Sequence, residues 1–480
     1  MVLKKCQIFT PKEYVVKLLD LIGYFGNEIL NKNILENSCG EGNILIEIVD
    51  RYINEAMNIG LSNSQIKKGL ENNILGFEID TSILNKCILN LNKKAAEYSI
   101  TGVQWNISSK DYLKTTMEQR FDYIVGNPPY IMYQDIEFED RVYLKKFFSS
   151  CAHGKFDYCY PFIEKGYTEL NKYSGKMIYL IPNSIFKNTF GQNLRDIMIQ
   201  PLVSIHDYKI TNVFKNAITS SAIILLDNNY KETYFNYYDT DFSKVVQLDK
   251  KKMINKKWFF SDLPVTLGKI KFSDHFDVGN SVATLLNKSF VIKNYELLKN
   301  TDLISVGSFK LERNILKPAG SPRALAKNIK ELIIFPYYYK DKKLVKYTED
   351  EFKIKYPYAY MYLEQFKEML ENRNSDKSAS WFEYGRSQAL SHLNQPKILV
   401  SSVMTNKVSA YKLDSNVIPY SGFYITVKNN SMLNLDTAKN ILESSEFYEY
   451  LINHGINANG KSIRFSVNDI KNYTIDKHLI

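Results

Sequence analysis

The stretch FDYIVGNPPY (residues 121–130) joins a short apolar run to a rigid polar turn. Tyr123, Ile124 and Val125 are typical of a buried strand, and the two prolines that follow fix the backbone and remove two amide donors. Open α/β sheets bind ligands beyond the carboxyl ends of their strands, so this turn is expected to face a ligand. The stretch therefore predicts an α/β fold with a site at residues 127–130.

Apolar runs and helical stretches alternate on both sides of this turn. Further strands are predicted at residues 34–35, 74–80, 175–182 and 220–227, and helices at 44–49, 82–98 and 162–170. Strands separated by helices imply a mostly parallel sheet with helices on both faces. The second half of the chain begins after an aromatic run at 234–238 and is less regular, with helices expected at 359–372 and 435–454.

Asn127, Pro128, Pro129 and Tyr130 carry the strongest chemical signal. The Asn127 side-chain oxygen and the Pro128 carbonyl can together accept both hydrogens of an exocyclic amine. Such an amine is a poor nucleophile because its lone pair is delocalised into the ring, and two acceptors localise that pair without a strong base. Tyr130 would lie on the flat face of the base. The alternative for these residues alone is a plain proline turn after a strand.

Three more elements precede this turn in a fixed order. The run Glu36-Asn37-Ser38-Cys39-Gly40-Glu41-Gly42 follows the first strand, and its glycines allow backbone to approach a ligand at a helix N-terminus. Glu78 ends the next strand and can accept both hydroxyls of a ribose. Asp111 and Tyr112 can offer an acceptor to an adenine amine and a ring to its face. Each element alone is common, but the order of all four is specific.

With these motifs in this order, the sequence resembles the gamma-class adenine-N6 DNA methyltransferases, which use S-adenosylmethionine. The resemblance implies a Rossmann-like class I methyltransferase domain with a mixed, mostly parallel sheet over residues 1–245. It implies an α+β target-recognition domain over residues 246–480. The match is good from residue 9 to about residue 228 and looser beyond, and the glycine loop SCGEG departs from the family pattern.

The resemblance also assigns roles to single residues. Asn127, Pro128, Pro129 and Tyr130 would be catalytic, and Tyr130 and Phe214 would stack on a target adenine that has left the DNA helix. Phe9-Thr10-Pro11 stands where the family has a segment that closes over the cofactor. The residues implied for the S-adenosylmethionine site are Thr10, Pro11, Glu36, Ser38, Cys39, Gly40, Gly42, Glu78, Ile79, Asp111, Tyr112, Asn127 and Phe162.

The two halves of the chain differ in charge. Residues 1–230 hold 25 Lys and Arg against 25 Asp and Glu, whereas residues 231–480 hold 37 against 27. A basic half suggests contact with a polyanion, although a generic solvated surface explains the charge equally well. Double-stranded DNA is the predicted partner, with a cognate restriction endonuclease as a further candidate. The candidate phosphate contacts are Arg386, Lys397, Arg464 and the lysines of residues 250–257.

Composition excludes several other classes of protein. No run approaches the roughly 18 apolar residues of a membrane span, and the N-terminal residues lack the apolar core of a signal peptide, so a cytoplasmic location without membrane contact is expected. The five cysteines show no metal-ligand spacing, so reduced thiols and no metal site are expected. They are Cys6, Cys39, Cys87, Cys151 and Cys159.

Three alternative functions stay open. An RNA base methyltransferase or a protein glutamine-N5 methyltransferase is one, because Asn-Pro-Pro-Tyr suits any planar amine or amide, although the long basic second half exceeds what a short peptide needs. A catalytically silent DNA-binding specificity protein is another. A fused nuclease is the third, and its only weak match is Glu351-Phe352-Lys353.

Overall fold

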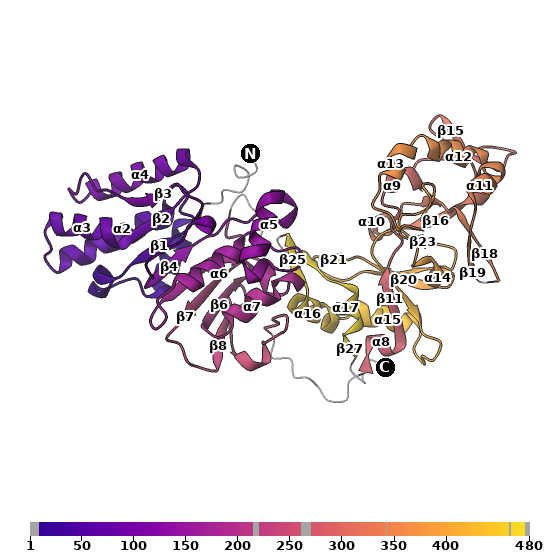
Figure 1. Ribbon diagram of the computed structural model, residues 1–480. Coiled ribbons are helices and arrows are strands. Elements are labelled where there is room, and N and C mark those ends of the chain that lie inside the picture. Colours follow the sequence, from indigo (N-terminus) through magenta and orange to yellow (C-terminus); the bar gives the residue numbers. More distant parts are fainter. Residues whose placement is uncertain (1–8, 215–219, 261–269, 342, 460–461, 476–480) are drawn as a thin grey trace. The chain divides into compact units, whose positions relative to one another are not determined.

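The computed structural model describes residues 9–214, 220–260, 270–341, 343–459 and 462–475. The chain forms two compact units (Figure 1): unit 1 comprises residues 1–263 and 456–461, and unit 2 comprises residues 264–455 and 462–480. The predicted boundary after residue 245 is wrong, because it falls inside β9 (Lys244–Asp249), which pairs with β8 (Tyr234–Asp239) in the sheet of unit 1. The lysines of residues 250–257 therefore belong to unit 1.

Unit 1 is built on a nine-stranded sheet of order β3-β2-β1-β4-β5-β7-β6-β8-β9. The strands from β3 to β5 run parallel to one another, and β7 runs antiparallel to both β5 and β6. This arrangement confirms the predicted mixed, mostly parallel α/β sheet. The remaining strands are β1 (Ile34–Glu36), β2 (Ile74–Phe77), β3 (Asn106–Ser108), β4 (Tyr123–Gly126), β5 (Lys176–Pro182), β6 (Leu202–Tyr208) and β7 (Ser221–Asp227), and β25 (Ile456–Asn459) also belongs to this unit.

The central strands are buried on both faces, because successive side chains point to opposite sides of the sheet. Ile124 of β4 and Tyr179 of β5 pack into one hydrophobic cluster, whereas their neighbours Val125 and Ile178 pack into another. The helices of unit 1 are α1 (Lys12–Ile22), α2 (Asn43–Asn58), α3 (Asn63–Asn73), α4 (Thr81–Ala96), α5 (Phe138–Phe147), α6 (Cys159–Glu169) and α7 (Gln192–Met198). Short 3-10 helices are η2 (Asn27–Asn31), η3 (Tyr112–Lys114), η4 (Tyr133–Asp135), η5 (Ser149–Cys151), η6 (Asn183–Phe186), η7 (Thr189–Gly191) and η8 (Lys250–Lys252).

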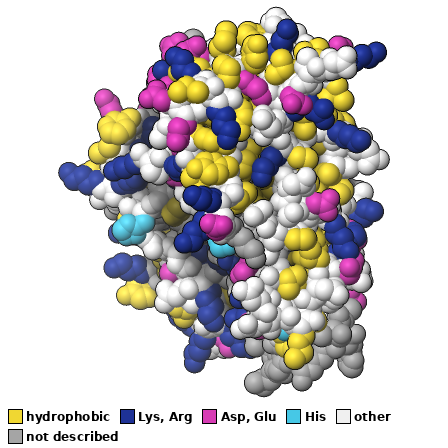
Figure 2. Space-filling model, turned by 90° about the vertical axis from the view of Figure 1, so that its right-hand side faces the viewer, with side chains coloured by type: hydrophobic (Ala, Val, Ile, Leu, Met, Phe, Trp, Pro, Cys, Tyr) yellow, Lys and Arg dark blue, Asp and Glu magenta, His cyan; other side chains and the backbone are white. Residues whose placement is uncertain are grey.

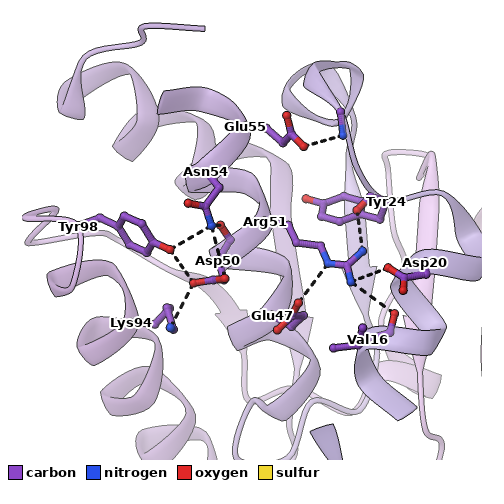
Figure 3. A network of polar contacts seen from close by, with 11 residues as sticks. Val16, Asp20, Tyr24, Glu47, Asp50, Arg51, Asn54, Glu55, Lys94 and Tyr98 are labelled. Atoms are coloured by element: carbon purple, nitrogen blue, oxygen red, sulfur yellow. Dashed lines mark hydrogen bonds and ion pairs between the residues drawn. The ribbon is translucent and has the colours of Figure 1, made fainter. Parts of the chain in front are cut away.

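A polar network fixes α2 between its neighbouring helices (Figure 3). Arg51 forms an ion pair with Asp20 of α1 at 2.7 Å. The preceding residue, Asp50, accepts a hydrogen bond from the Tyr98 hydroxyl at 2.8 Å and pairs with Lys94 of α4 at 3.2 Å. Because both sides of α2 are tied down, its N-terminus and the glycine loop before it are held in a fixed position relative to β1.

Unit 2 consists of several small, mostly antiparallel sheets with short helices, as an α+β unit does. Two sheets have four strands, with orders β11-β24-β20-β22 and β12-β17-β16-β23. Its strands are β10 (Ile270–Lys271), β11 (Phe276–Asn280), β12 (Val291–Ile292), β13 (Glu296–Leu297), β14 (Leu303–Val306), β15 (Phe309–Glu312), β16 (Leu316–Gly320), β17 (Glu331–Ile334), β18 (Tyr337–Lys340), β19 (Lys343–Lys346), β20 (Lys397–Val400), β21 (Val403–Met404), β22 (Ala410–Leu413), β23 (Ile418–Pro419), β24 (Phe423–Val427), β26 (Ser462–Arg464) and β27 (Thr474–Ile475).

The helices of unit 2 are short. They are α8 (Phe272–His275), α9 (Asn287–Phe290), α10 (Pro322–Ala326), α11 (Glu349–Lys355), α12 (Pro357–Glu364), α13 (Lys367–Glu371), α14 (Leu390–Leu393), α15 (Leu435–Leu442), α16 (Ser445–His454) and α17 (Val467–Lys471), and η9 (Arg313–Ile315) is a 3-10 helix. Two hydrophobic clusters of its own fill the unit, one around Phe335 and Tyr384 and the other around Ile398 and Phe447. In the described part of the chain, no helix is long and apolar enough to cross a membrane.

Candidate active site

A cavity of about 290 Å³ opens in unit 1 beyond the carboxyl ends of β1, β2 and β4. The strand β1 lies between β2 and β4, so the strand order reverses here, which is where open α/β sheets bind ligands. The predicted site residues that line the cavity are Ser38, Gly40, Glu78, Ile79, Asp111, Tyr112, Asn127, Pro128, Pro129, Tyr130 and Phe162. Four motifs separated along the sequence thus meet in one place.

The turn of residues 127–130 follows β4 directly and is tied to strands on both sides. Ser38 Oγ, in the glycine loop after β1, donates a hydrogen bond to the Asn127 carbonyl oxygen at 3.2 Å. The Tyr130 hydroxyl donates to the Leu180 carbonyl oxygen in β5 at 3.0 Å. Burial raises the pKa of Tyr130 well above its usual value, so its hydroxyl stays protonated. The turn is therefore rigid, with Asn127 and Pro128 on the cavity wall.

The glycine loop takes a backbone path that other residues rarely adopt. Gly40 has φ 53° and Gly42 has φ 90°. A Cβ atom at Gly42 would lie 2.7 Å from the Cys87 sulfur in α4, so the loop packs tightly on that helix. The amide of Cys39 donates to the Phe77 carbonyl oxygen at 2.8 Å. The structure does not bring Cys39 or Gly42 to the cavity wall, and both shape the loop from behind.

Glu78 lies at the end of β2, half-buried, and organises the loop opposite it. Its carboxylate accepts from the Gly40 amide at 3.1 Å and from the Asp80 amide at 2.9 Å. Burial raises its pKa, which the two amide hydrogen bonds partly offset. A carboxylate can accept about four hydrogen bonds, and Glu78 lines the cavity. Glu78 can therefore receive hydroxyl donors from a ligand without releasing the loop, and the exposed Ile79 stands beside it.

Asp111 begins η3 and is engaged on both carboxylate oxygens. Oδ1 accepts from the Leu113 amide at 2.9 Å, and Oδ2 lies 3.5 Å from the Lys114 ammonium. Lys114 also pairs with Asp140 of α5 at 2.8 Å. The ammonium thus links η3 to the helix that follows the turn of residues 127–130, across the cavity wall.

Aromatic rings form an apolar side of the cavity. Tyr112 lies 5.4 Å from Phe77 and 5.7 Å from Phe162 between ring centroids, and Tyr158 lies 5.7 Å from Phe162. The Tyr112 hydroxyl donates to the buried Glu169 carboxylate at 2.6 Å, which fixes the ring. Such a set of rings suits a flat heterocycle, while the carboxylates of Glu78 and Asp111 beside it suit its polar groups.

Besides Cys39 and Gly42, three more predicted cofactor residues lie outside the cavity wall. Glu36 is buried behind the loop, and this burial raises its pKa well above the usual range. Thr10 is buried and its carbonyl oxygen accepts from the Asn43 side chain at 3.2 Å, and Pro11 caps α1. Phe9, which precedes them, lines the cavity. The segment therefore reaches the cavity through Phe9 rather than through Thr10 or Pro11.

Tyr130 and Phe214 lie together, as the stacking prediction requires, but without space between them. Their ring centroids are 6.0 Å apart and the rings meet edge to face at 76°. A base held between two parallel rings needs about 7 Å between their planes, since each carbon contact takes about 3.5 Å. Phe214 is buried and in direct ring contact with Tyr130. Stacking of both rings on one base therefore requires Phe214 to turn away.

Several residues on the cavity wall were not among the predicted site residues. Phe9 and Asn37 belong to recognised motifs, whereas several others come from the stretch after Tyr130 that leads into α5, which has no recognisable motif. These additional wall residues are Phe9, Asn37, Phe77, Asp80, Lys110, Lys114, Ile131, Asp135, Ile136, Glu137, Asp140 and Tyr158. Among the described residues, no group of three or more His, Cys, Asp and Glu side chains is placed to hold a metal ion.

The predicted phosphate contacts separate into two groups. Arg386 and Arg464 are exposed on unit 2. Lys397 is fully buried, and its ammonium donates to the carbonyl oxygens of Asp414 and Val417 at 2.7 and 3.0 Å. The prediction that Lys397 contacts a phosphate is therefore wrong, because its ammonium is buried and bonded to carbonyl oxygens inside unit 2. Lys250 is likewise buried, and its ammonium donates to the Gln200 carbonyl oxygen at 2.6 Å.

The sheet order, the glycine loop after β1 and the cavity at the strand ends define unit 1 as a Rossmann-like class I methyltransferase fold. Residues 41–214 match the family described as Eco57I restriction-modification methylase. The matched region includes the end of the glycine loop, Glu78, Asp111 and the turn of residues 127–130, and it confirms the resemblance found in the motifs.

Relatives extend the similarity beyond the matched region. The chain is 23% identical to the Type II restriction enzyme and methyltransferase RM.Eco57I of Escherichia coli, over 81% of this chain and 47% of that protein, so it spans about half of that relative's length. It is 22% identical to the Type II methyltransferase M.BstVI of Geobacillus stearothermophilus, over 95% of this chain and 87% of that one. The structure of the Type IIL restriction-modification enzyme MmeI in complex with DNA covers 96% of this chain and 64% of its own, with a TM-score of 0.59 and 14% identity.

Proposed function

We propose that this protein is a site-specific DNA methyltransferase that moves a methyl group from S-adenosylmethionine to the N6 amine of a flipped adenine in double-stranded DNA. It would act within a restriction-modification system or as a solitary methylase. The observation that carries this proposal is the rigid turn of residues 127–130 on the wall of the same cavity as Glu78, Asp111 and the glycine loop. The similarity to RM.Eco57I and M.BstVI, both named as methyltransferases, supports the same reaction class.

The chemistry of the cavity wall fits S-adenosylmethionine. Glu78 offers carboxylate oxygens to ribose hydroxyls, and Asp111 can accept from an adenine amine beside the rings of Tyr112 and Phe162. Ser38 and Gly40 also line the cavity, and Ser38 is bonded to Asn127, so the glycine loop lies next to the turn. When bound, this cofactor supplies an electrophilic methyl group.

The turn prepares the acceptor amine. The Asn127 side-chain oxygen and the Pro128 carbonyl accept the two amine hydrogens, which localises the nitrogen lone pair for direct displacement. Tyr130 holds the face of the base and is itself held by Leu180. Such an amine cannot reach the cavity from within a base stack, so the base leaves the helix, and Phe214 turns away from Tyr130 to admit it.

Unit 2 is the proposed target-recognition domain. Its exposed Arg386 and Arg464 are candidate phosphate contacts. The weak nuclease match of residues 351–353 finds no support, because the Glu351 carboxylate caps its own helix through the Thr348 amide at 2.8 Å and Lys353 lies over the Tyr360 ring. A cognate endonuclease stays a separate partner in this proposal.

The test is single-molecule sequencing of DNA from a methylation-deficient host that expresses the protein, scored for N6-methyladenine. We expect methylation at every copy of one short motif. Asn127→Ala should lower this activity by at least about 100-fold while cofactor binding is kept. Removal of one preorganised polar group that stabilises a transition state typically lowers turnover by this factor. Asn58→Ala, at the exposed end of α2, is the matched control and should methylate like the wild type.

Each other outcome points elsewhere. Cofactor binding without methylated adenine would favour an RNA base or a protein glutamine as the acceptor. Failure to bind S-adenosylmethionine at all would favour a catalytically silent DNA-binding protein. Full activity of Asn127→Ala would contradict the role given to the turn.

A further inference from the structure

The strands β18 and β19 of unit 2 form a separate two-stranded ribbon. They pair with each other, from Tyr337 opposite Lys346 to Lys340 opposite Lys343, and with no third strand among the described residues. In Figure 1 the ribbon runs along an edge of unit 2 beside α14. A free two-stranded ribbon is one of the few protein elements that fit the major groove of DNA.

The two faces of the ribbon differ in chemistry. The inner face is anchored, because the Tyr337 hydroxyl accepts from the Tyr384 amide at 2.9 Å and the Tyr339 hydroxyl donates to the Leu390 carbonyl oxygen at 2.8 Å. Since side chains alternate along a strand, Tyr338, Lys340 and Lys343 share the opposite face. All three are exposed. The ribbon is thus fixed from behind and presents an aromatic ring and two ammonium groups to solvent.

Lys340 and Lys343 face each other directly across the ribbon. Like charges in this position destabilise a strand pair. Neither ammonium forms an ion pair with a carboxylate among the described residues, whereas Lys346 at the other end pairs with Glu383 at 2.7 Å. The sequence of residues 340–343 is Lys-Asp-Lys-Lys, so a third lysine lies in the same short stretch. An arrangement that is unfavourable in the free protein becomes favourable against a polyanion.

The basic and aromatic character continues beyond the ribbon. Tyr338 lies 4.9 Å from Tyr347 between ring centroids. Lys355, exposed on α11, lies over the Tyr347 and Tyr356 rings at 5.3 and 5.5 Å. Figure 2 shows Lys and Arg side chains mixed with hydrophobic and with Asp and Glu side chains across the face that it views, so the cation-ring pairs named here are local. This interleaving of cations and rings is typical of nucleic-acid surfaces.

We propose that the outer face of the β18–β19 ribbon enters the major groove of duplex DNA, with Lys340 and Lys343 on phosphates and Tyr338 toward the base edges. The proposal rests on the proposed function and adds the element that holds the DNA. B-form DNA has a major groove about 12 Å wide, which admits such a ribbon, whereas the major groove of A-form RNA is too narrow for side chains to read.

The experiment measures binding of fluorescein-labelled random-sequence duplex DNA by anisotropy over a range of salt concentrations. Lys340→Ala/Lys343→Ala should weaken binding by about tenfold and reduce the salt slope by about 1.8, since each lost phosphate contact contributes about 0.9. Lys299→Ala/Lys330→Ala, which removes two exposed lysines of the same unit outside the ribbon, is the matched control and should behave like the wild type. A duplex RNA of equal length should compete poorly.

A second variant separates DNA contact from folding. Lys340→Glu replaces the like-charge pair by an opposite-charge pair, so it should raise the melting temperature by up to about 3 °C while it lowers DNA affinity further. Weakened binding together with a lower melting temperature in both ribbon variants would point to a structural role and overturn the proposal.

The remaining outcomes separate this proposal from the proposed function. Wild-type binding by Lys340→Ala/Lys343→Ala, in a protein that methylates DNA, would overturn the ribbon contact alone. Equal competition by duplex RNA would overturn insertion into a B-form groove. A wild-type protein that neither binds nor methylates DNA would overturn both.

Discussion

At the scale of single residues, Glu78 connects the glycine loop to the cavity. Its carboxylate holds the Gly40 and Asp80 amides and also faces the cavity. Loss of two hydroxyl contacts to a charged group, at about 1.5 kcal/mol or more each, should raise the Kd for S-adenosylmethionine by at least about 100-fold in Glu78→Ala, measured by isothermal titration calorimetry. Glu78→Gln keeps one acceptor oxygen, so its Kd should lie between those of the wild type and Glu78→Ala.

Glu118→Ala is the control for this change, since Glu118 is exposed and does not line the cavity. Its Kd should equal that of the wild type. An unchanged Kd in folded Glu78→Ala would remove Glu78 from the cofactor site.

His206 should make unit 1 sensitive to acid. Burial lowers its pKa from 6.5 to about 4, with Lys17 adding to the shift, and its ring stacks on Tyr238 at 4.3 Å. Above pH 6.5 the residue is neutral in both states and contributes nothing. As the pH falls from 6.5 to 4, the unfolded chain gains a proton that the folded chain does not, so about 3 kcal/mol of stability is lost.

His206→Phe keeps a stacked ring but cannot titrate. Urea titrations at pH 7 and pH 4 give the free energy of unfolding at each pH. Between these two values it should fall by about 3 kcal/mol less in His206→Phe than in the wild type. Equal losses in both proteins would show that another group controls acid unfolding.

The sequence predicts the position and role of some site residues but not of others. Asn127 and Tyr130 could be located because their motif follows an apolar strand, and the strand end sets where they lie. The burial of Lys397 could not be predicted. Its ammonium donates to carbonyl oxygens of residues 414–417, which lie next to it only in the folded chain. The direct contact of Tyr130 with Phe214 likewise depends on side-chain packing that no sequence pattern encodes.

At the scale of elements, the junction of the glycine loop with α2 packs tightly against α4. Gly42→Ala faces both a strained φ of 90° and a sulfur atom 2.7 Å away, so it should destabilise unit 1 by about 2–5 kcal/mol. Gly23 has φ 79° with nothing within 4 Å of a Cβ atom. Gly23→Ala should therefore cost only about 1–2 kcal/mol, from backbone strain alone.

Thermal unfolding measures the loss of stability in each variant. The extra loss in Gly42→Ala over that in Gly23→Ala is the contribution of the contact with Cys87. Cys87→Ala in the Gly42→Ala background should recover part of the loss because it removes that sulfur. Equal destabilisation in Gly42→Ala and Gly23→Ala would contradict tight packing at this junction.

Elements with continuous apolar runs were predicted well, and those with mixed patterns were not. The strands β1, β2, β4, β5 and β7 and the helix α4 lie where the sequence indicates them. The strand β8, which pairs with both β6 and β9, alternates between half-exposed and buried residues. The sequence therefore predicts the start of the second half directly after its aromatic run, although the sheet continues to β9. The helix expected at 435–454 is interrupted, because Ser444 caps α16 and begins a new helix there. Such breaks depend on local hydrogen bonds more than on apolar spacing.

At the scale of the whole molecule, two units with separate hydrophobic clusters predict separate unfolding. S-adenosylmethionine should stabilise only unit 1, where all the cavity-lining residues lie. At a concentration 100 times its Kd, the cofactor adds about 2.7 kcal/mol, which should raise one calorimetric transition by about 5–10 °C and leave the other in place. Glu78→Ala should abolish this shift, whereas Lys340→Ala/Lys343→Ala should keep it. A single transition, or equal shifts of both, would show that the two units unfold as one and that the separation of their cores has no thermodynamic consequence.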